Sequence, residues 1–471
     1  MTALKTDRTI GVVGAGTMGA GIAQLAAAAG HPVLLFDAFD GAADTGRSRI
    51  ARGLEKLVAR GKMTAEDVTA LMERITIAPT LADLNPCAMV VEAIVENLEV
   101  KRDLFANLED IVADEAILAT NTSSISVTSI ARDLRHPERM AGMHFFNPAP
   151  VMKLVEVISG VATSAEVAQT VFDTAQSWGK IAVHAKSTPG FIVNRVARPF
   201  YAEALRLYEE QVAEPATFDA LLTQGAGFRM GPFALMDLIG NDVNYMVCKS
   251  VFDLFYQEPR FRPSILQLEQ VNAGRLGRKS GRGWYDYGEG AKMPEPQTEA
   301  ASDAPLIDGF DIAGCTVDGV LIQPTDGRTA AQVCRSAGQP VILCDHIDAG
   351  GSRLAFATSK DVPEVVIARL VATLADQAIQ ASRLPDWPGL VVLRTIAMLA
   401  NEGFEAVLQG VTDEAGVDAA MRYGLNYPKG PIAWSREIGL SRVLSVLDAI
   451  HGLTGDPRYR ASMALRFAAE A

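Results

Sequence analysis

The chain has 471 residues, 49% of them hydrophobic, and a formal net charge of −13 from 43 basic and 56 acidic residues. That length suggests about three domains, and the lack of a long basic run excludes a nucleic-acid-binding surface. Five cysteines without a CxxC pair argue against a disulfide framework and a metal site. The sequence has no signal-like segment and no apolar run of membrane length, so we expect a cytoplasmic protein with no membrane segment.

The first segment has the pattern of a dinucleotide-binding fold. Residues 9–13 and 32–36 predict buried parallel strands, and residues 20–29 predict a helix between them. A GxGxxG loop joins the first strand to the helix: Gly14, Ala15, Gly16, Thr17, Met18 and Gly19. Such a loop gives a tight turn and lets a pyrophosphate approach the helix N-terminus. A coincidental glycine turn is the weaker alternative, because the whole strand–loop–helix–strand unit is present.

Asp37 stands at the end of the second strand, 18 residues after Gly19. An acidic residue there is typical of a ribose ligand, and its charge repels a 2′-phosphate, so Asp37 favours NAD over NADP. Residues 48–60 predict an amphipathic helix that carries several basic side chains. That helix is either an ordinary solvated face or a basic patch for an anionic part of a substrate.

Polar residues follow the later predicted strands, which cover residues 89–91, 117–120, 140–143 and 154–158. Because open α/β sheets bind ligands at the carboxyl ends of their strands, we expect these residues to share one edge. They are Glu92, Glu96 and Lys101, then Asn121 to Ser124, then His144; Glu156 lies within the last of these strands.

Three of these polar side chains, together with Asn194, suit the oxidation of an alcohol by NAD. His144 has the ordinary chemistry of a general base, and Glu156 could fix its tautomer and stabilise its charged form. A carboxylate inside an apolar strand is costly unless paired, which favours this role for Glu156 over a structural one. Ser123 and Asn194 could hold the substrate oxygen.

Seven motifs together resemble the L-3-hydroxyacyl-CoA dehydrogenase family of β-oxidation. They lie in family order between residues 9 and about 287: 14–19 (GAGTMG), 90–97 (VVEAIVEN), 121–124 (NTSS), 142–148 (GMHFFNP), 151–158 (VMKLVEVI), 188–195 (TPGFIVNR) and 279–285 (KSGRGWY). The resemblance implies a Rossmann-type α/β domain followed by an all-α 3-hydroxyacyl-CoA dehydrogenase C-terminal domain.

The resemblance also implies roles for individual residues. The catalytic pair falls on His144 and Glu156, with Ser123 and Asn194 on the substrate side. The implied NAD contacts are the glycine loop with Asp37, Glu96, Lys101, Ser123, Asn147 and Lys279. Implied CoA contacts fall on Gly53 and Arg60, where family members often carry Ser and Lys. Gly53 removes a hydroxyl, whereas Arg60 keeps the charge and can hold a phosphate.

We therefore expect five segments: 1–187, a NAD-binding Rossmann domain; 188–287, a helical domain; 288–305, a linker; 306–385, a small α/β degenerate Rossmann-like domain; and 386–471, a second, degenerate helical domain. In the helical domain, Thr188 is expected to cap a long helix over 191–211. In the small domain, 316–323, 341–344 and 354–357 predict strands and 363–381 a helix. Asp345-His346 is expected to be a structural strand end.

The last segment repeats the first helical domain. Residues 388–394 (PGLVVLR) match 189–195 (PGFIVNR) at an offset of 199 residues, and Gly424 and Gly430-Pro431 match Gly225 and Gly231-Pro232 at the same offset. Leu393 replaces Asn194, so the copy is expected to keep the fold without the chemistry. Because two-domain family members commonly dimerise through this domain, we expect a homodimer or an internal pseudo-dimer of the two copies.

The leading expectation is NAD-dependent oxidation of (S)-3-hydroxyacyl-CoA to 3-oxoacyl-CoA. The layout is similar to 3-hydroxyadipyl-CoA dehydrogenases of phenylacetate catabolism. The alternatives are short-chain 3-hydroxybutyryl-CoA dehydrogenases of β-oxidation or butanoate metabolism, a CoA-independent hydroxyacid dehydrogenase, and a non-catalytic binding protein. A substrate with a second carboxylate needs a cation in the acyl pocket; Arg198 and Arg229 are candidates, although a solvated surface place is the simpler expectation for both.

Overall fold

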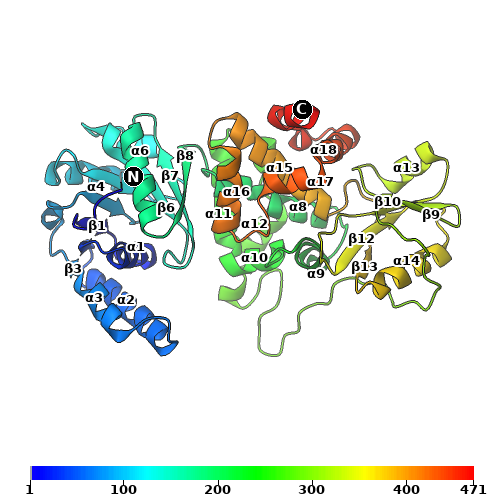
Figure 1. Cartoon of the computed structure of the whole chain (residues 1–471), viewed down its shortest axis with the longest axis horizontal. Coiled ribbons are helices and arrows are strands. Elements are labelled where there is room, and N and C mark those ends of the chain that lie inside the picture. Colours follow the sequence, from blue (N-terminus) through cyan, green and yellow to red (C-terminus); the bar gives the residue numbers. More distant parts are fainter. Residues whose placement is uncertain (1–2) are drawn as a thin grey trace. The chain divides into compact units, whose positions relative to one another are not determined.

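The computed structural model describes residues 3–471, which pack as two compact units. The first unit contains the chain up to Val193 and, from near the C-terminus, residues 410–425. The second unit contains residues 194–409 and 426–471 (Figure 1). Within residues 3–471, no helix combines the length and the apolar character that crossing a membrane requires.

The first unit is built on an eight-stranded sheet in the order β3-β2-β1-β4-β5-β6-β7-β8. All neighbouring strands are parallel except β6 and β7. The strands are β1 (Ile10–Val13), β2 (Val33–Phe36), β3 (Ile75–Ile77), β4 (Met89–Glu92), β5 (Ile117–Thr120), β6 (Met140–Phe145), β7 (Leu154–Ser159) and β8 (Ile181–Lys186). The 3-2-1-4-5-6 order of the first six strands is that of dinucleotide-binding sheets.

The helices of the first unit are α1 (Thr17–Ala28), α2 (Ala42–Ala59), α3 (Ala65–Glu73), α4 (Leu98–Ile111), α5 (Val127–Ala131), α6 (Ala165–Ser177) and α16 (Glu414–Gly424). Several begin at a side-chain cap, since Thr64, Asn97 and Ser164 each accept a hydrogen bond from the backbone N–H three residues on. The predicted Rossmann architecture is confirmed. The sequence prediction did not include β3 and β8, and it began the basic helix α2 six residues late.

The long helix predicted over 191–211 is wrong in its start and in its continuity. The structure has α7 (Val193–Val196) and α8 (Arg198–Glu209). Phe191 has a left-handed φ of 47°, so the helix cannot begin there, and Thr188 bonds to the Lys186 carbonyl instead of capping it. Pro199 lacks an N–H to continue the ladder, which separates the two helices at Ala197.

The second unit combines two helical bundles and a small sheet. The first bundle contains α8, α9 (Pro215–Ala220), α10 (Pro232–Ile239), α11 (Asn241–Leu254) and α12 (Ile265–Asn272). The second contains α15 (Val392–Leu408), α17 (Pro431–Ile438), α18 (Leu440–Thr454) and α19 (Met463–Glu470). The segment 288–305, predicted as a linker, has no helix or strand.

The small sheet has the order β13-β12-β11-β10-β9. Its elements are β9 (Cys315–Val317), β10 (Val320–Pro324), α13 (Ala330–Ala337), β11 (Val341–Cys344), β12 (Arg353–Thr358), α14 (Glu364–Asp376) and β13 (Gln380–Arg383). The single strand predicted over 316–323 is wrong, because Asp318 and Gly319 take positive φ and turn the chain into a hairpin. The helix predicted to residue 381 is also too long, since Ala378 has a φ of 59° and β13 follows.

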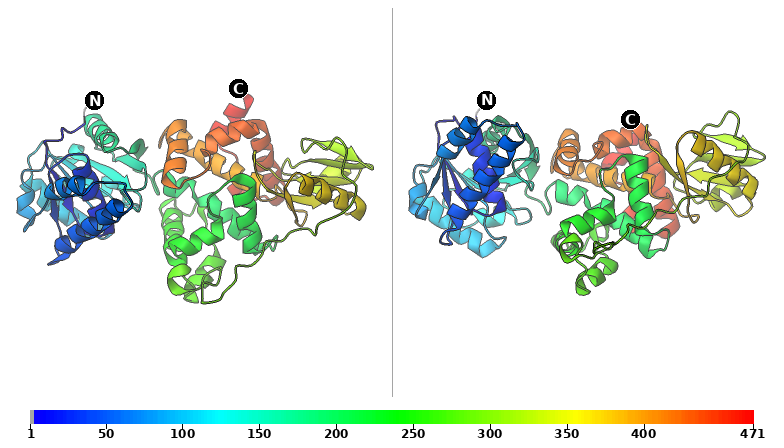
Figure 2. Two further views of the ribbon diagram at one scale, coloured as in Figure 1. Left: turned by 60° about the horizontal axis from the view of Figure 1, so that its bottom comes forward. Right: turned by 90° about the horizontal axis from the view of Figure 1, so that it is seen from below.

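The two helical copies pack on each other through reciprocal ion pairs. Arg195 Nε lies 2.6 Å from Glu402 Oε1, and Arg394 Nε lies 2.7 Å from Glu203 Oε2. Each pair joins the same two positions at the offset of 199 residues, with the copies exchanged. Helices α8 and α15 lie side by side, green and orange in Figure 2. The predicted contact between the copies is confirmed.

A second reciprocal contact involves the glycines of the repeat. A side chain at Gly225 would meet the Arg353 carbonyl and Val392, and a side chain at Gly424 would meet Leu154 and Val193. Arg353 and Val392 stand 199 residues after Leu154 and Val193. The segment around Gly225 in the first copy therefore packs on the starts of β12 and α15. In the same way, the segment around Gly424 in the second copy packs on the starts of β7 and α7.

Candidate active site

The glycine loop leaves room for a dinucleotide. A Cβ on Gly14 would lie 2.5 Å from the Ala93 carbonyl oxygen, and one on Gly19 would lie 1.7 Å from the Gly14 carbonyl oxygen. Both positions therefore require glycine for the turn and for close packing. Gly16, in contrast, faces open space and is exposed. The open place lies at the start of α1, where helix N–H groups are available to a pyrophosphate, so the loop fits NAD.

Asp37 closes the other side of this loop. Its carboxylate accepts hydrogen bonds from the Ala15 N–H at 2.7 Å and from the Phe39 N–H at 3.0 Å. These bonds hold the end of β2 against the glycine loop, at the switch point between β1 and β4. Asp37 is half-buried and thus can also offer its carboxylate to a ribose.

Glu96 and Lys101 form a polar cluster with the loop after β5. Glu96 Oε1 accepts from Thr122 Oγ1 at 2.6 Å and from the Ser123 N–H at 3.0 Å. Burial raises the pKa of Glu96, but these bonds and the charge of Lys101 outweigh it and lower the pKa. Lys101 is only 1% exposed, and its ammonium lies 3.3 Å from Glu96 Oε2. Lys101 thus holds Glu96, which in turn orders the loop that carries Ser123.

His144 and Glu156 face each other across the antiparallel strands β6 and β7. His144 Nδ1 lies 2.7 Å from Glu156 Oε2, and both side chains are buried. An ionised carboxylate oxygen can only accept, so Nδ1 carries the proton and Nε2 keeps its lone pair. The ring packs against Phe146 and Phe191, with centroids 4.5 Å and 5.9 Å away. This arrangement fixes the tautomer that a general base needs.

The second oxygen of Glu156 braces the start of the helical domain. Oε1 accepts from the N–H groups of Ile192 and Val193 at 3.0 Å and 2.9 Å. These residues directly precede Asn194, the second residue of α7. One carboxylate therefore orients the histidine and also anchors the segment that carries Asn194.

The other predicted site residues lie in different places. Asn147 is exposed, two residues after the end of β6. Gly53 and Arg60 are exposed, seven residues apart along α2 and its C-terminal end, and so lie on one face. Lys279 belongs to the second unit, in a short turn where its ammonium lies 2.6 Å from Asp242.

Two residues that the sequence placed at this edge of the sheet, without a role in the site, have supporting roles. Glu92 is fully buried and accepts from Lys101 at 2.5 Å and from Thr120 at 2.6 Å. Asn121 Oδ1 accepts from the Phe145 N–H at 2.8 Å, which ties the loop after β5 to the end of β6. The sequence signal for the supporting role of Glu92 was its position, a carboxylate at the end of an apolar strand.

The comparisons with known proteins agree with this geometry. Residues 9–188 match the NAD binding domain of 3-hydroxyacyl-CoA dehydrogenase, and residues 190–287 and 389–471 match its C-terminal domain. The chain belongs to the 3-hydroxyacyl-CoA dehydrogenase family. Residues 322–388 match the reduced Rossmann-fold domain of 3-hydroxybutyryl-CoA dehydrogenase. The predicted duplication of the helical domain is confirmed, and the protein is an NAD-dependent 3-hydroxyacyl-CoA dehydrogenase.

Relatives of full and of partial length support the same family. The 3-hydroxyadipyl-CoA dehydrogenase of Escherichia coli K12 is 45% identical over 462 residues, covering 98% of this chain and 97% of its own. A solved 3-hydroxybutyryl-CoA dehydrogenase from E. coli K12 has a TM-score of 0.95 at 44% identity, covering 99% of both chains. A probable 3-hydroxybutyryl-CoA dehydrogenase of Bacillus subtilis is 43% identical, covering 60% of this chain and 98% of its own.

The second copy of this dehydrogenase architecture has lost the histidine–glutamate pair. β12 pairs with β13 as β7 pairs with β8, in a register that places Ala355 where Glu156 stands. Asp345, opposite Ala355, takes the place of His144. Its buried carboxylate accepts from Val391 and Val392 at 2.9 Å and 2.8 Å. Asp345 therefore stabilises the start of α15, as Glu156 stabilises the start of α7, but it has no histidine to orient. The prediction that Asp345 is a structural residue at the end of a strand is confirmed.

The fit of the glycine loop predicts a specific effect of removing the Asp37 carboxylate. We expect Asp37→Ala to raise KM for NAD by roughly tenfold or more, because it removes the carboxylate that is expected to accept from the ribose. The kcat should stay near the wild-type value, because ribose binding is lost equally from ground state and transition state. Asp40→Ala, three residues on and exposed, is the control in steady-state assays. An unchanged KM for NAD in Asp37→Ala would contradict the assignment.

Proposed function

We propose that the physiological substrate of this dehydrogenase is 3-hydroxyadipyl-CoA, in phenylacetate catabolism. The full-length relative with that name supports the proposal, since it matches 98% of this chain, including the reduced Rossmann-fold segment and second helical copy. The shorter 3-hydroxybutyryl-CoA dehydrogenases match only about 60% of the chain. 3-Hydroxybutyryl-CoA is the second candidate, because the solved structure with a TM-score of 0.95 carries that name.

The proposed chemistry rests on one observation, the 2.7 Å contact between His144 Nδ1 and Glu156 Oε2. His144 Nε2 takes the hydroxyl proton of the substrate, and Glu156 stabilises the imidazolium that forms. Ser123 and Asn194 position the substrate oxygen and thioester. NAD, held by the glycine loop and Asp37, supplies the hydride acceptor.

Further parts of the proposal concern the surroundings of the reaction. Gly53 and Arg60 mark a face of α2 for the CoA moiety, where Arg60 holds a phosphate. Asn147 and Lys279 complete the cofactor contacts. We also propose the division into segments 1–187, 188–287, 288–305, 306–385 and 386–471, and a cytoplasmic location.

The substrate is tested by NADH formation from (S)-3-hydroxybutyryl-CoA and 3-hydroxyadipyl-CoA. We expect kcat/KM to be at least tenfold higher with the adipyl substrate, because binding a second carboxylate adds charge-assisted hydrogen bonds worth about 1.5–3 kcal/mol. Both assays use the same enzyme preparation and saturating NAD. A preference for the butyryl substrate would instead place the enzyme in short-chain β-oxidation or butanoate metabolism.

A further inference from the structure

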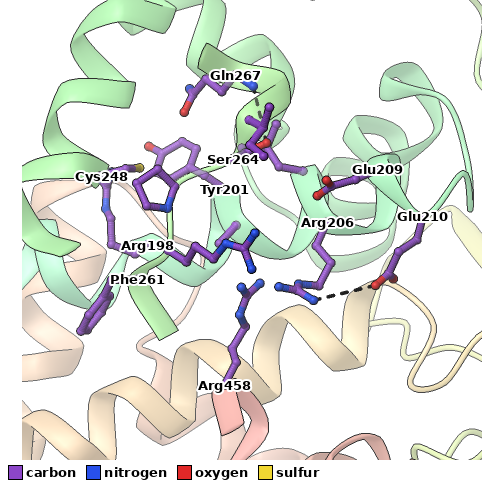
Figure 3. A pocket seen from close by; sticks show the side chains of 15 residues that line it. Arg198, Tyr201, Arg206, Glu209, Glu210, Cys248, Phe261, Ser264, Gln267 and Arg458 are labelled. Atoms are coloured by element: carbon purple, nitrogen blue, oxygen red, sulfur yellow. Dashed lines mark hydrogen bonds and ion pairs between the residues drawn. The ribbon is translucent and has the colours of Figure 1, made fainter. Parts of the chain in front are cut away.

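The second unit contains a cavity of about 250 Å³ lined by four arginines. They are Arg198, Arg206, Arg262 and Arg458. Figure 3 shows the guanidinium groups of Arg198, Arg206 and Arg458 turned toward one another. Like charges gathered in this way repel unless an anion lies between them. The surface place expected for Arg198 is wrong, since this residue is only 6% exposed, whereas Arg229 is exposed as expected.

Two of these arginines are buried without a carboxylate partner. Arg458 is 4% exposed, and its guanidinium makes no hydrogen bond or ion pair with the residues that the structure describes. Arg198 donates to the Cys248 sulfur at 3.1 Å and stacks on Tyr201, while its Nε has no partner in the described chain. Burial lowers the pKa of Arg458 and outweighs the nearby charges of Glu203 and Asp456, which favour its charged form. A buried cation without a direct counter-ion is unfavourable.

Two of the acidic side chains around the cavity pair with Arg206, and a third is exposed. Asp456 lies 3.0 Å from Arg206 Nη1. Glu210 lies 3.9 Å from the same Nη1 and accepts from the Trp387 indole at 2.8 Å, and Glu209 is exposed. The acidic side chains around the cavity therefore balance the charge of Arg206, but they form no ion pair with Arg198 or Arg458 in the described residues.

The internal repeat explains why Arg458 has no carboxylate partner of its own. The sequence Glu258-Pro259-Arg260-Phe261 corresponds to Asp456-Pro457-Arg458-Tyr459, and Arg260 pairs with the buried Glu402 at 2.9 Å. The carboxylate equivalent to Glu402 is Glu203. Glu203 already accepts from Arg394 at 2.7 Å and from the Tyr459 hydroxyl at 2.9 Å. Phe261, the counterpart of Tyr459, has no hydroxyl, so Glu402 remains available to Arg260. In the second copy Tyr459 donates to Glu203 instead, and Arg458 is left facing the cavity.

We propose that this cavity binds one small oxyanion, a carboxylate or phosphate group, between Arg198, Arg206 and Arg458. Guanidinium groups bind such groups bidentately. The counterpart position, where Arg260 is satisfied by Glu402, offers no second site.

The oxyanion has two possible sources. One is a free anion. The other is the terminal carboxylate of a dicarboxylic acyl substrate, because Arg198 begins α8 only four residues after Asn194. The existence of the anion site does not depend on the proposed substrate. Its assignment to the carboxylate of the acyl chain does rest on the proposed function.

The experiment measures thermal unfolding of the full chain in inorganic phosphate and in adipate, against potassium chloride of equal ionic strength. We expect either probe at about tenfold over its Kd to raise the wild-type Tm by roughly 1–3 °C. Arg458→Met should unfold at or above the wild-type Tm without anion, because it removes an unpaired buried charge. Its anion-dependent shift should be lost. Arg206→Met is a second variant, and Arg460→Met, an exposed arginine two residues on, should retain the full shift.

Kinetics of the same variants then distinguish the two sources. A KM that rises about tenfold or more for 3-hydroxyadipyl-CoA, and not for 3-hydroxybutyryl-CoA, in Arg458→Met assigns the site to the substrate carboxylate. Unchanged KM values for both substrates, together with the lost thermal shift, assign it to a free anion. No wild-type stabilisation beyond that of chloride, or equal stabilisation of wild type, Arg458→Met and Arg206→Met, overturns the site. The wild-type preference between the two substrates tests the proposed function separately.

Discussion

Replacing His144 by Gln is expected to lower kcat by roughly a hundredfold or more, because the general base for the hydroxyl proton is removed. The amide fills most of the imidazole space, so binding of NAD and of the acyl-CoA should remain close to wild type. Glu156 keeps its hydrogen bonds from Ile192 and Val193 in this variant, so the helix start that carries Asn194 stays braced. The loss should therefore appear in kcat far more than in KM.

The measurement is NADH formation under saturating substrates, with NAD binding followed separately by fluorescence. His136→Gln is the matched control, because His136 is a partly exposed histidine paired with Glu138 at 3.2 Å and lies outside the candidate site. A His144→Gln enzyme that turns over within threefold of wild type would disprove the proposed role. Intact NAD binding in the inactive variant would exclude misfolding as the cause.

Replacing Glu402 by Gln is expected to reduce the free energy of unfolding by about 3–5 kcal/mol. Glu402 is fully buried and pairs with Arg195 at 2.6 Å and with Arg260 at 2.9 Å. A glutamine side chain at this position would keep the shape but remove the charge, which leaves two buried guanidinium groups without a counter-ion. Both arginines lie between the helical copies, so the effect reports directly on the contact between them.

Chemical denaturation of the full chain is the measurement for Glu402→Gln. Glu364→Gln is the control, because Glu364 pairs with Arg383 at 3.0 Å while its side chain is 75% exposed. Such an exposed pair contributes about 0–1 kcal/mol, so its loss should be small. Equal stability losses in the two variants would show that the internal ion pairs do not hold the copies together.

The sequence predicted those parts of the site that depend on local pattern. The GxGxxG loop, Asp37 and the strand alternation around Glu156 all follow from short-range rules, and the pairing of His144 with Glu156 is observed. The second role of Glu156 was not predicted, because its contact with Ile192 and Val193 joins segments 36 and 37 residues apart.

Other misses have comparable tertiary causes. The predicted helix start after Thr188 was wrong because Phe191 adopts a left-handed conformation. The local sequence TPGF does not predict that conformation. Arg198 was expected to be solvated because arginines usually are. It is buried because the helical copies and their flanking segments close around it, an effect of the whole fold.

The reciprocal ion pairs have a consequence for behaviour at low concentration. An interface between separate subunits dissociates on dilution, at a concentration set by its Kd. Here both halves of the interface belong to one polypeptide, joined through residues 288–387, so their effective local concentration is fixed by the connecting chain. Dilution cannot separate them, and the two copies are free to diverge, since a change in one is no longer imposed on an identical partner. The replacement of Asn194 by Leu393 in the second copy illustrates that freedom.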